Sequence, residues 1–311
     1  MTGAVFMDIV IAVNDAYYEA CRTMLHSLFT KNRKSVISIH LFYRQLTERE
    51  RKGLCKYVEK LGGTFHSYIV PDSVFRDLPY EGSEEKPNKL FSIEVYYRIL
   101  AYQILPKDMN RVLWLDADIV ITSDISEFYS QSFDGMDLIA CADVSEGEEY
   151  IAERKTAMNL EDSHIYFNSG VLLMNLEKIR RDIRDDDLRD IINRYGSNLV
   201  YPDQDLLNKI FDGKVKYADG RIYNNQLYGK QYQDSIEDAC ILHYVYIFKP
   251  WKPLLAKRNC SYYWKERLAM GDLLGYVLFM GVYQVHRPIK AAAYYREIIA
   301  AKVRNKIAHR D

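Results

Sequence analysis

Cysteine is scarce in this chain and is not arranged for cross-linking or for zinc binding. The five cysteines are scattered over 311 residues, and no two of them are spaced as Cys-x-x-Cys (Cys21, Cys55, Cys141, Cys240, Cys260). An odd, dispersed set of this kind argues against a disulfide framework or a cysteine zinc site and suits a reducing compartment. We therefore expect a cytoplasmic protein.

Long apolar runs, a large net charge and glycine-rich phosphate loops are also missing. The apolar run Val5–Val13 has no basic leader and is too short for a signal peptide or a membrane span. The formal net charge of −1 gives no electrostatic argument for nucleic acid as a partner. Neither a Gly-x-Gly-x-x-Gly nor a Walker-type loop is present, so bound phosphates need another source of positive charge.

What the chain does contain is a regular alternation of strand-like and helix-like segments. Thr47 and Glu50 form a predicted capping box at the start of one helix, which Gly62-Gly63 should end. A long polar loop, Pro71–Asn88, precedes another predicted helix, Phe91–Leu105. Apolar strands are predicted at Met7–Val13, Ser35–Tyr43, Phe65–Val70, Val112–Thr122, Asp137–Ala142, Ile165–Met174 and Cys240–Tyr246. This order predicts an α/β fold with a mainly parallel central sheet, whose ligands bind beyond the carboxyl ends of the strands.

The composition of the sequence changes after Trp251, and we predict a domain at 1–251 and a helical, basic extension at 252–311. Within the extension, Gln284–Asp311 has seven Lys/Arg against two Asp/Glu. A basic amphipathic helix can lie on an anionic membrane surface, which would place the protein at the inner face of the membrane. It can equally pack on the domain with a solvated basic face. Both interpretations stay open.

Two carboxylates interrupt the apolar segment VLWLDADIVIT, Val112–Thr122. In a strand, Asp116 and Asp118 would point to the same face, where like charges repel unless a cation lies between them. Mg²⁺ or Mn²⁺ held by one or two carboxylates keeps positions open for substrate phosphates. A solvated surface turn is the structural alternative, but the apolar flanks disfavour it.

Two chemistries fit such a pair. LDADIV matches the short Asp-x-Asp-x-Val pattern of phosphatases that phosphorylate the first aspartate, but it lies far from the chain start, and Gly271-Asp272 lacks the expected second aspartate. The other chemistry is nucleotide-sugar transfer, in which the metal contacts the diphosphate and supplies the positive charge that no phosphate loop provides.

Four segments in order resemble glycosyltransferase family 8, which includes retaining bacterial lipopolysaccharide galactosyl- and glucosyltransferases and glycogenin. They are IVIAVNDAYY (Ile9–Tyr18), VLWLDADIVI (Val112–Ile121), YFNSGVLLMNLEKIR (Tyr166–Arg180) and HYVYIFKPW (His243–Trp251), with YYRIL (Tyr96–Leu100) and YPDQDLLN (Tyr201–Asn208) also fitting. The resemblance implies a Rossmann-like GT-A fold for nucleotide-diphospho-sugar transfer. It also implies a metal-dependent retaining hexosyltransferase that uses UDP-glucose or UDP-galactose, with a cell-surface glycan or lipid-linked sugar as acceptor.

The resemblance assigns roles to three groups of residues. The cation, Mn²⁺ with Mg²⁺ as an alternative, would be bound by Asp116, Asp118 and His243. The UDP-hexose would contact Ala12, Asn14, Asp15, Tyr17, Arg98, Asp116, Ala117, Asn168 and Lys249. The catalytic residues in the sugar pocket would be Gln204, Asp205 and Asp203. Helix capping is the structural alternative for Asn14, Asp15 and Asp203, as ordinary packing is for His243.

One position departs from the family pattern. Tyr246 stands three residues after His243, where the family usually has a glycine that lets the backbone approach the phosphates. The tyrosine side chain could crowd the diphosphate, or the loop could take another path. A catalytically impaired nucleotide-sugar-binding protein is therefore the alternative to an active enzyme.

Overall fold

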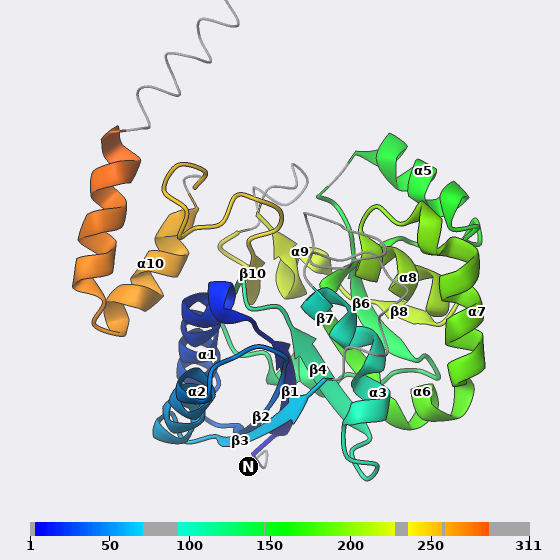
Figure 1. The fold of residues 1–311 in the computed structure, drawn as a ribbon, viewed down its shortest axis with the longest axis horizontal. Helices are drawn as coiled ribbons and strands as arrows, with labels where there is room; N and C mark the ends of the chain where they lie inside the picture. The colour runs from blue at the N-terminus through cyan, green and yellow to red at the C-terminus, as the bar shows by residue number, and fades with distance from the viewer. Residues whose placement is uncertain (1–3, 71–92, 146, 228–235, 257–258, 286–311) are drawn as a thin grey trace, which may run out of the picture. The chain divides into compact units, whose positions relative to one another are not determined.

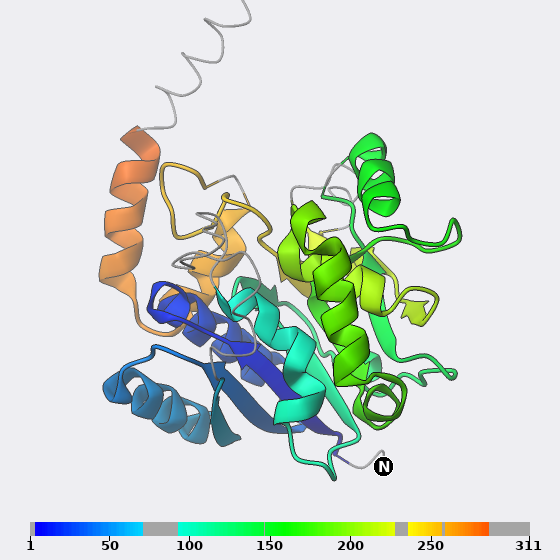
Figure 2. The same ribbon diagram turned by 45° about the vertical axis from the view of Figure 1, so that its right-hand side comes forward.

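A computed structural model of the chain describes residues 4–70, 93–145, 147–227, 236–256 and 259–285 (Figures 1 and 2). The chain divides into two compact units, Met1–Val245 and Tyr246–Asp311. The predicted boundary at residue 251, between a domain and a helical, basic extension, stays a prediction. The loop Pro71–Asn88 and most of the basic segment lie outside the described residues.

The first unit is built on a seven-stranded sheet with the order β3-β2-β1-β4-β7-β6-β8 (Figure 1). Strand β7 is antiparallel to β4 and to β6, and the other four neighbouring pairs are parallel. The predicted α/β class and mainly parallel sheet are confirmed. The strands are β1 (Phe6–Ala12), β2 (Val36–Tyr43), β3 (Thr64–Ile69), β4 (Arg111–Leu115), β6 (Leu138–Ala142), β7 (Phe167–Asn175) and β8 (Val215–Tyr217).

Successive residues of β1 show how the sheet is covered on both faces. Ile9 and Ile11 pack in one core cluster with α1 (Tyr18–Lys31) and α2 (Glu48–Lys60), and Val10 packs in the other with η3 (Ile93–Leu100) and α8 (Pro202–Ile210). The other helices in the described part of this unit are η1 (Asp15–Tyr17), α3 (Ala101–Ile104), α4 (Ser126–Tyr129), α5 (Glu148–Ala157), α6 (Leu176–Asp182), α7 (Asp185–Tyr195), η4 (Gly196–Asn198) and α9 (Gly220–Tyr223).

Local signals for α2 were read correctly from the sequence. Thr47 and Glu50 form the capping box, and Gly62 follows the helix with φ of 90°. The predicted helix Phe91–Leu105 is different in type, because its described part is mainly the 3₁₀ helix η3 followed by the single turn α3.

The predicted strand Val112–Thr122 is wrong as a single element. Strand β4 ends at Leu115, and β5 (Ile119–Ile121) belongs to a separate three-stranded sheet with β10 (Ile241–His243) and β9 (Asn225–Gln226). The two aspartates therefore lie in the connecting turn and not on a strand face. The physical reason is the position of β4 inside the sheet, where both faces are apolar core and a pair of charges has no room.

In the second unit, α10 (Cys260–Ala269) packs against a helix that spans 273–285. The Trp264 ring lies 4.6 Å from the Phe279 ring, centroid to centroid, and its indole N–H donates to the Pro250 carbonyl at 3.0 Å. Tyr246, at the start of this unit, has φ of 60°. None of the helices in the described part of the chain is both long and apolar enough to cross a bilayer.

Candidate metal centre

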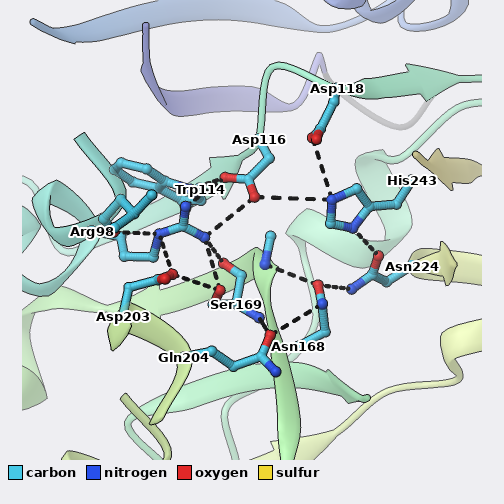
Figure 3. Close-up of polar contacts among 12 residues, drawn as sticks. Arg98, Trp114, Asp116, Asp118, Asn168, Ser169, Asp203, Gln204, Asn224 and His243 are labelled. Carbon is cyan, nitrogen blue, oxygen red and sulfur yellow. Dashed lines mark hydrogen bonds and ion pairs between the residues drawn. The ribbon is translucent and has the colours of Figure 1, made fainter. Parts of the chain in front are cut away.

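Three side chains at the junction of the two sheets converge on one point, where each offers a ligand atom within 4.8 Å of the other two. Asp116 and Asp118 come from the β4–β5 turn and His243 from the end of β10 (Figure 3). The His243 Nε2 atom lies 3.3 Å from Asp118 Oδ1 and 3.9 Å from Asp116 Oδ2. His243 and Asp118 are buried. The structure thus brings together the three residues predicted to bind the cation.

The Asp116 carboxylate is held in place by hydrogen bonds and ion pairs with Trp114 and Arg98. The indole N–H of Trp114 donates to Asp116 Oδ1 at 2.9 Å, and Arg98 contacts Oδ1 at 3.0 Å and Oδ2 at 3.3 Å. The buried guanidinium also stacks over the Trp114 ring, 5.0 Å from its centroid, and donates to the Ser169 carbonyl at 2.6 Å. These contacts orient Asp116 toward His243. Contact of Arg98 with a sugar stays a prediction.

Gly170 on β7 leaves the space that the cluster occupies. A Cβ atom built on Gly170 would lie 2.2 Å from His243 Cε1 and 2.9 Å from Asp116 Oδ2. The Gly170 carbonyl also accepts the Asp116 backbone N–H at 3.0 Å, which fixes the start of the turn. No larger residue fits here unless the ligand side chains move.

The predicted sugar-pocket residues Asn168, Asp203 and Gln204 lie beside this cluster, on β7 and the first turn of α8. Asp203 accepts the Ser169 hydroxyl at 2.8 Å and pairs with Arg98 Nε at 3.3 Å. Burial raises the pKa of the Asp203 carboxyl, and the positive charge of Arg98 opposes that shift. Because Tyr201 is the N-cap of α8, Asp203 is not the N-cap that its sequence position also allowed.

Asp205 is placed differently from the other predicted pocket residues. It is completely buried, pairs with Arg154 at 3.2 Å and accepts the Tyr166 hydroxyl at 2.6 Å. It also accepts the backbone N–H groups of Val200 and Tyr201, at 2.8 and 3.1 Å. These contacts fix the start of α8, and a catalytic role for Asp205 stays a prediction.

Three of the residues predicted to contact the UDP-hexose follow the carboxyl end of β1, namely Asn14, Asp15 and Tyr17. Asn14 caps η1 by accepting the Tyr17 N–H at 3.3 Å, and the exposed Asp15 accepts the Ala16 N–H at 3.0 Å. Burial, together with the negative charges of Asp118 and Asp116, raises the pKa of Tyr17. Tyr17 is therefore near the metal cluster, while nucleotide contacts for it, Asn14, Asp15, Ala12 and Ala117 stay predictions.

Lys249 belongs to the second unit, where its side chain is buried and its backbone N–H donates to the Ile247 carbonyl at 2.9 Å. Its contact with a diphosphate stays a prediction. Tyr246 has the left-handed backbone conformation that favours glycine, so a non-glycine residue is held in the conformation expected for the family glycine.

Several residues that surround the candidate ligands were not predicted from the sequence. Trp114 and Ser169 stand inside quoted segments, so their proximity to predicted ligands was a usable signal. Asn224 had no such signal. It accepts a hydrogen bond from His243 Nδ1 at 2.9 Å and donates to Asn168 Oδ1 at 3.0 Å, contacts created by the pairing of β9 with β10.

The donor set fits a hard or borderline divalent cation. Two carboxylates and one imidazole suit Mn²⁺, whereas Mg²⁺ prefers oxygen ligands alone. The Nδ1 atom of His243 already faces Asn224, so Nε2 is the ring nitrogen that faces both carboxylates. Two anionic oxygens and a ring nitrogen this close together are the arrangement that a cation stabilises.

Comparison with known sequences gives one family over most of the chain. The sequence model of glycosyl transferase family 8 matches residues 8–254. The lipopolysaccharide 1,2-glucosyltransferase of Escherichia coli strain K12 is 28% identical over 270 residues, which cover 83% of this chain and 76% of that protein. Another Escherichia coli lipopolysaccharide 1,2-glucosyltransferase is 23% identical over 265 residues, covering 81% and 75% of the two chains.

Comparison with solved structures identifies the fold. The galactosyltransferase LgtC, solved with donor and acceptor sugar analogues, has a TM-score of 0.71 at 24% identity, covering 85% of this chain and 96% of its own. The glycosyltransferase GlyE of Streptococcus pneumoniae TIGR4 has a TM-score of 0.63 at 20% identity, covering 85% of this chain and 60% of its own. The chain therefore has the GT-A glycosyltransferase fold that was predicted.

Proposed function

Because the chain belongs to glycosyl transferase family 8, we propose that it moves a hexose from UDP-glucose or UDP-galactose to an acceptor hydroxyl, retaining the α configuration. The observation that carries this proposal is the convergence of Asp116, Asp118 and His243 within 4.8 Å. A divalent cation bound there supplies positive charge that neutralises the departing UDP. The family match favours this chemistry over that of the phosphatases.

The residues of the chain have separate tasks in this proposal. Asp116 and Asp118 supply the anionic oxygens and His243 the imidazole nitrogen that hold the cation. Asn14 and Tyr17 bind uridine, and Lys249 places a positive charge on the diphosphate. Such charges stabilise the transition state more than the ground state, because negative charge grows on UDP as the glycosidic bond breaks.

The contacts of Gln204 support attack of the acceptor on the same face from which UDP departs. A double displacement needs a nucleophile on the opposite face of the sugar. The carbonyl oxygen of Gln204 already accepts the Ser169 N–H at 3.1 Å and the Asn168 amide at 3.2 Å, and an amide is a weak nucleophile. Same-face attack, with the leaving phosphate taking the acceptor proton, is the route that we propose.

A donor screen with a UDP-release assay tests the function and identifies the sugar. We expect manganese-dependent release with one UDP-hexose, and we expect Asp118→Asn to abolish it and to weaken UDP binding. Asp190→Asn, an exposed carboxylate on α7, is the matched control that should release UDP like the wild type. Circular dichroism checks that both proteins are folded. Full turnover by Asp118→Asn would contradict the metal assignment.

Tyr246 motivates a second candidate, a nucleotide-sugar-binding protein without full activity. Its backbone conformation is the one favoured by glycine, but it carries a tyrosine ring. Calorimetric titration of the wild type with UDP and Mn²⁺ separates the two candidates. Binding weaker than millimolar, about −4 kcal/mol, would favour the impaired protein.

We also propose that the acceptor is a cell-surface glycan or lipid-linked sugar and that the second unit contacts the inner face of a membrane. The similar Escherichia coli proteins are lipopolysaccharide glucosyltransferases. The helix at 273–285 packs one face on Trp264 through Tyr276 and Phe279. The opposite side is an exposed apolar stripe, formed by Leu273, Leu274, Val277, Leu278, Val282 and Val285. The basic sequence of 286–311 follows it directly, which is the composition of an interfacial segment.

A further inference from the structure

A chain of buried amide side chains runs from the sugar-pocket residues to the metal cluster (Figure 3). The donor-to-acceptor direction of its hydrogen bonds is set by backbone N–H groups, which can only donate. The Ser169 N–H donates to Gln204 Oε1 at 3.1 Å, and the Gly170 N–H donates to Asn168 Oδ1 at 3.0 Å. At the far end, Gln204 Nε2 donates to the Asp143 carboxylate at 2.5 Å. Asn168 and Gln204 therefore each have one amide orientation.

The orientation of Asn168 determines that of Asn224. Because Asn168 presents its oxygen, the group of Asn224 that faces it at 3.0 Å must be the NH₂. The carbonyl oxygen of Asn224 then faces His243 Nδ1 at 2.9 Å, and that nitrogen must carry the proton. The lone pair is left on Nε2, the atom directed at Asp118 and Asp116.

We propose that Asn224 is a positioning residue that fixes the tautomer and ring orientation of His243 for cation binding. The inference rests on the proposed metal dependence and extends it to a residue that does not touch the cation. The partner of a ligating histidine keeps the ring in the ligating tautomer, and losing such a partner lowers metal affinity about 10- to 100-fold. Asn224 is fully buried between α9 and β9, so water does not replace it freely.

The same series of hydrogen-bonded amide side chains links the cation site to the sugar pocket. Asn168 and Gln204 are its middle members, and both are predicted to contact the sugar. A sugar that binds Asn168 or Gln204 therefore contacts side chains that are connected to His243 by hydrogen bonds. Asn224 therefore positions the ligand and also connects the two halves of the donor site.

Variants at Asn224 that keep four side-chain heavy atoms test the proposal. Asn224→Leu removes the acceptor, whereas Asn224→Asp keeps an oxygen that accepts from His243 Nδ1. Asn225→Leu is the matched control, because this neighbouring buried asparagine donates to the Arg221 carbonyl at 3.2 Å. We expect calorimetric titration with MnCl₂ alone to show a 10- to 100-fold loss of affinity for Asn224→Leu, a smaller loss for Asn224→Asp and little change for the control.

A second readout does not depend on the Asn224 variants being stable. Nitrogen-15 NMR of the imidazole rings reports which ring nitrogen carries the proton in the wild-type protein, and the His243 signals are those missing from His243→Gln. We expect the neutral His243 ring to carry its proton on Nδ1. Where Asn224→Leu folds, its spectrum should show a mixture of tautomers.

The outcomes separate this inference from the proposed function. If the wild type binds manganese and Asn224→Leu binds it equally well, the positioning role is wrong while the metal site stands. A neutral His243 ring protonated on Nε2 would also overturn the inference. A wild type that binds no manganese would overturn the metal dependence and this inference together.

Discussion

At the scale of single residues, Gly170 sets how closely the backbone of β7 approaches the candidate metal ligands. Its missing side chain leaves room for His243 Cε1 and Asp116 Oδ2. We predict that Gly170→Ala lowers manganese affinity, because the new methyl group must displace His243 or Asp116. Overpacking of this kind also costs about 1–3 kcal/mol of folding free energy.

Calorimetric titration and urea unfolding measure the two effects of Gly170→Ala. The control is Gly147→Ala, because a Cβ at Gly147 meets nothing within 4 Å and its φ of −73° suits any residue. Unchanged manganese affinity in Gly170→Ala would show that the cation does not bind between these ligands.

The sequence pointed to the three candidate metal ligands but not to the residues that hold them in place. Asp116 and Asp118 stand out because charge inside an apolar segment is unusual, and the resemblance supplied His243. Asn224 and Asp143 give no local signal, because their roles arise from side chains 19 and 61 residues away in the chain. Contacts made by tertiary pairing are not encoded in spacing along the sequence.

At the scale of elements, the start of α8 depends on a buried ion pair. Asp205 is completely buried and Arg154 nearly so. We predict that Asp205→Asn destabilises the protein by about 3–5 kcal/mol, because the Arg154 guanidinium is left buried without its counter-charge. Urea unfolding measures this, and the exposed Asp190→Asn should change stability by less than about 0.5 kcal/mol. Wild-type stability combined with lost turnover would instead indicate a catalytic Asp205.

Element boundaries could be predicted where they depend on residues that are neighbours in the sequence. The prediction failed where strand pairing in a sheet sets the boundary. The capping box of α2 can be predicted from the spacing of Thr47 and Glu50 alone. The break between β4 and β5 is not visible in VLWLDADIVIT, because apolar residues flank the aspartates on both sides. Only the pairing of β5 with β10 in a second sheet shows that one apolar segment serves two sheets.

At the scale of the whole molecule, the exposed apolar stripe on the helix at 273–285 predicts binding to anionic vesicles. Leu274 and Leu278 are 71% and 63% exposed. We expect their joint replacement by Gln to reduce flotation with vesicles that contain phosphatidylserine, since the apolar contact with the acyl region is lost. Leu254→Gln, an exposed leucine outside the stripe, is the control.

Salt and a deletion separate the two contributions to vesicle binding. Removal of 286–311 should weaken binding mainly at low ionic strength, because the charge attraction is screened by salt. Wild-type flotation by the double Gln protein and by the deletion would contradict membrane contact through this unit.

The turn between β4 and β5 gives the proposed cation a mechanical consequence. Asp116 directly follows β4 of the large sheet, while Asp118 directly precedes β5 and His243 ends β10 in the small sheet. An ion that binds all three is a removable cross-link between two sheets. Chelation should therefore loosen the small sheet before the large one, and the donor site would lose its shape together with its charge.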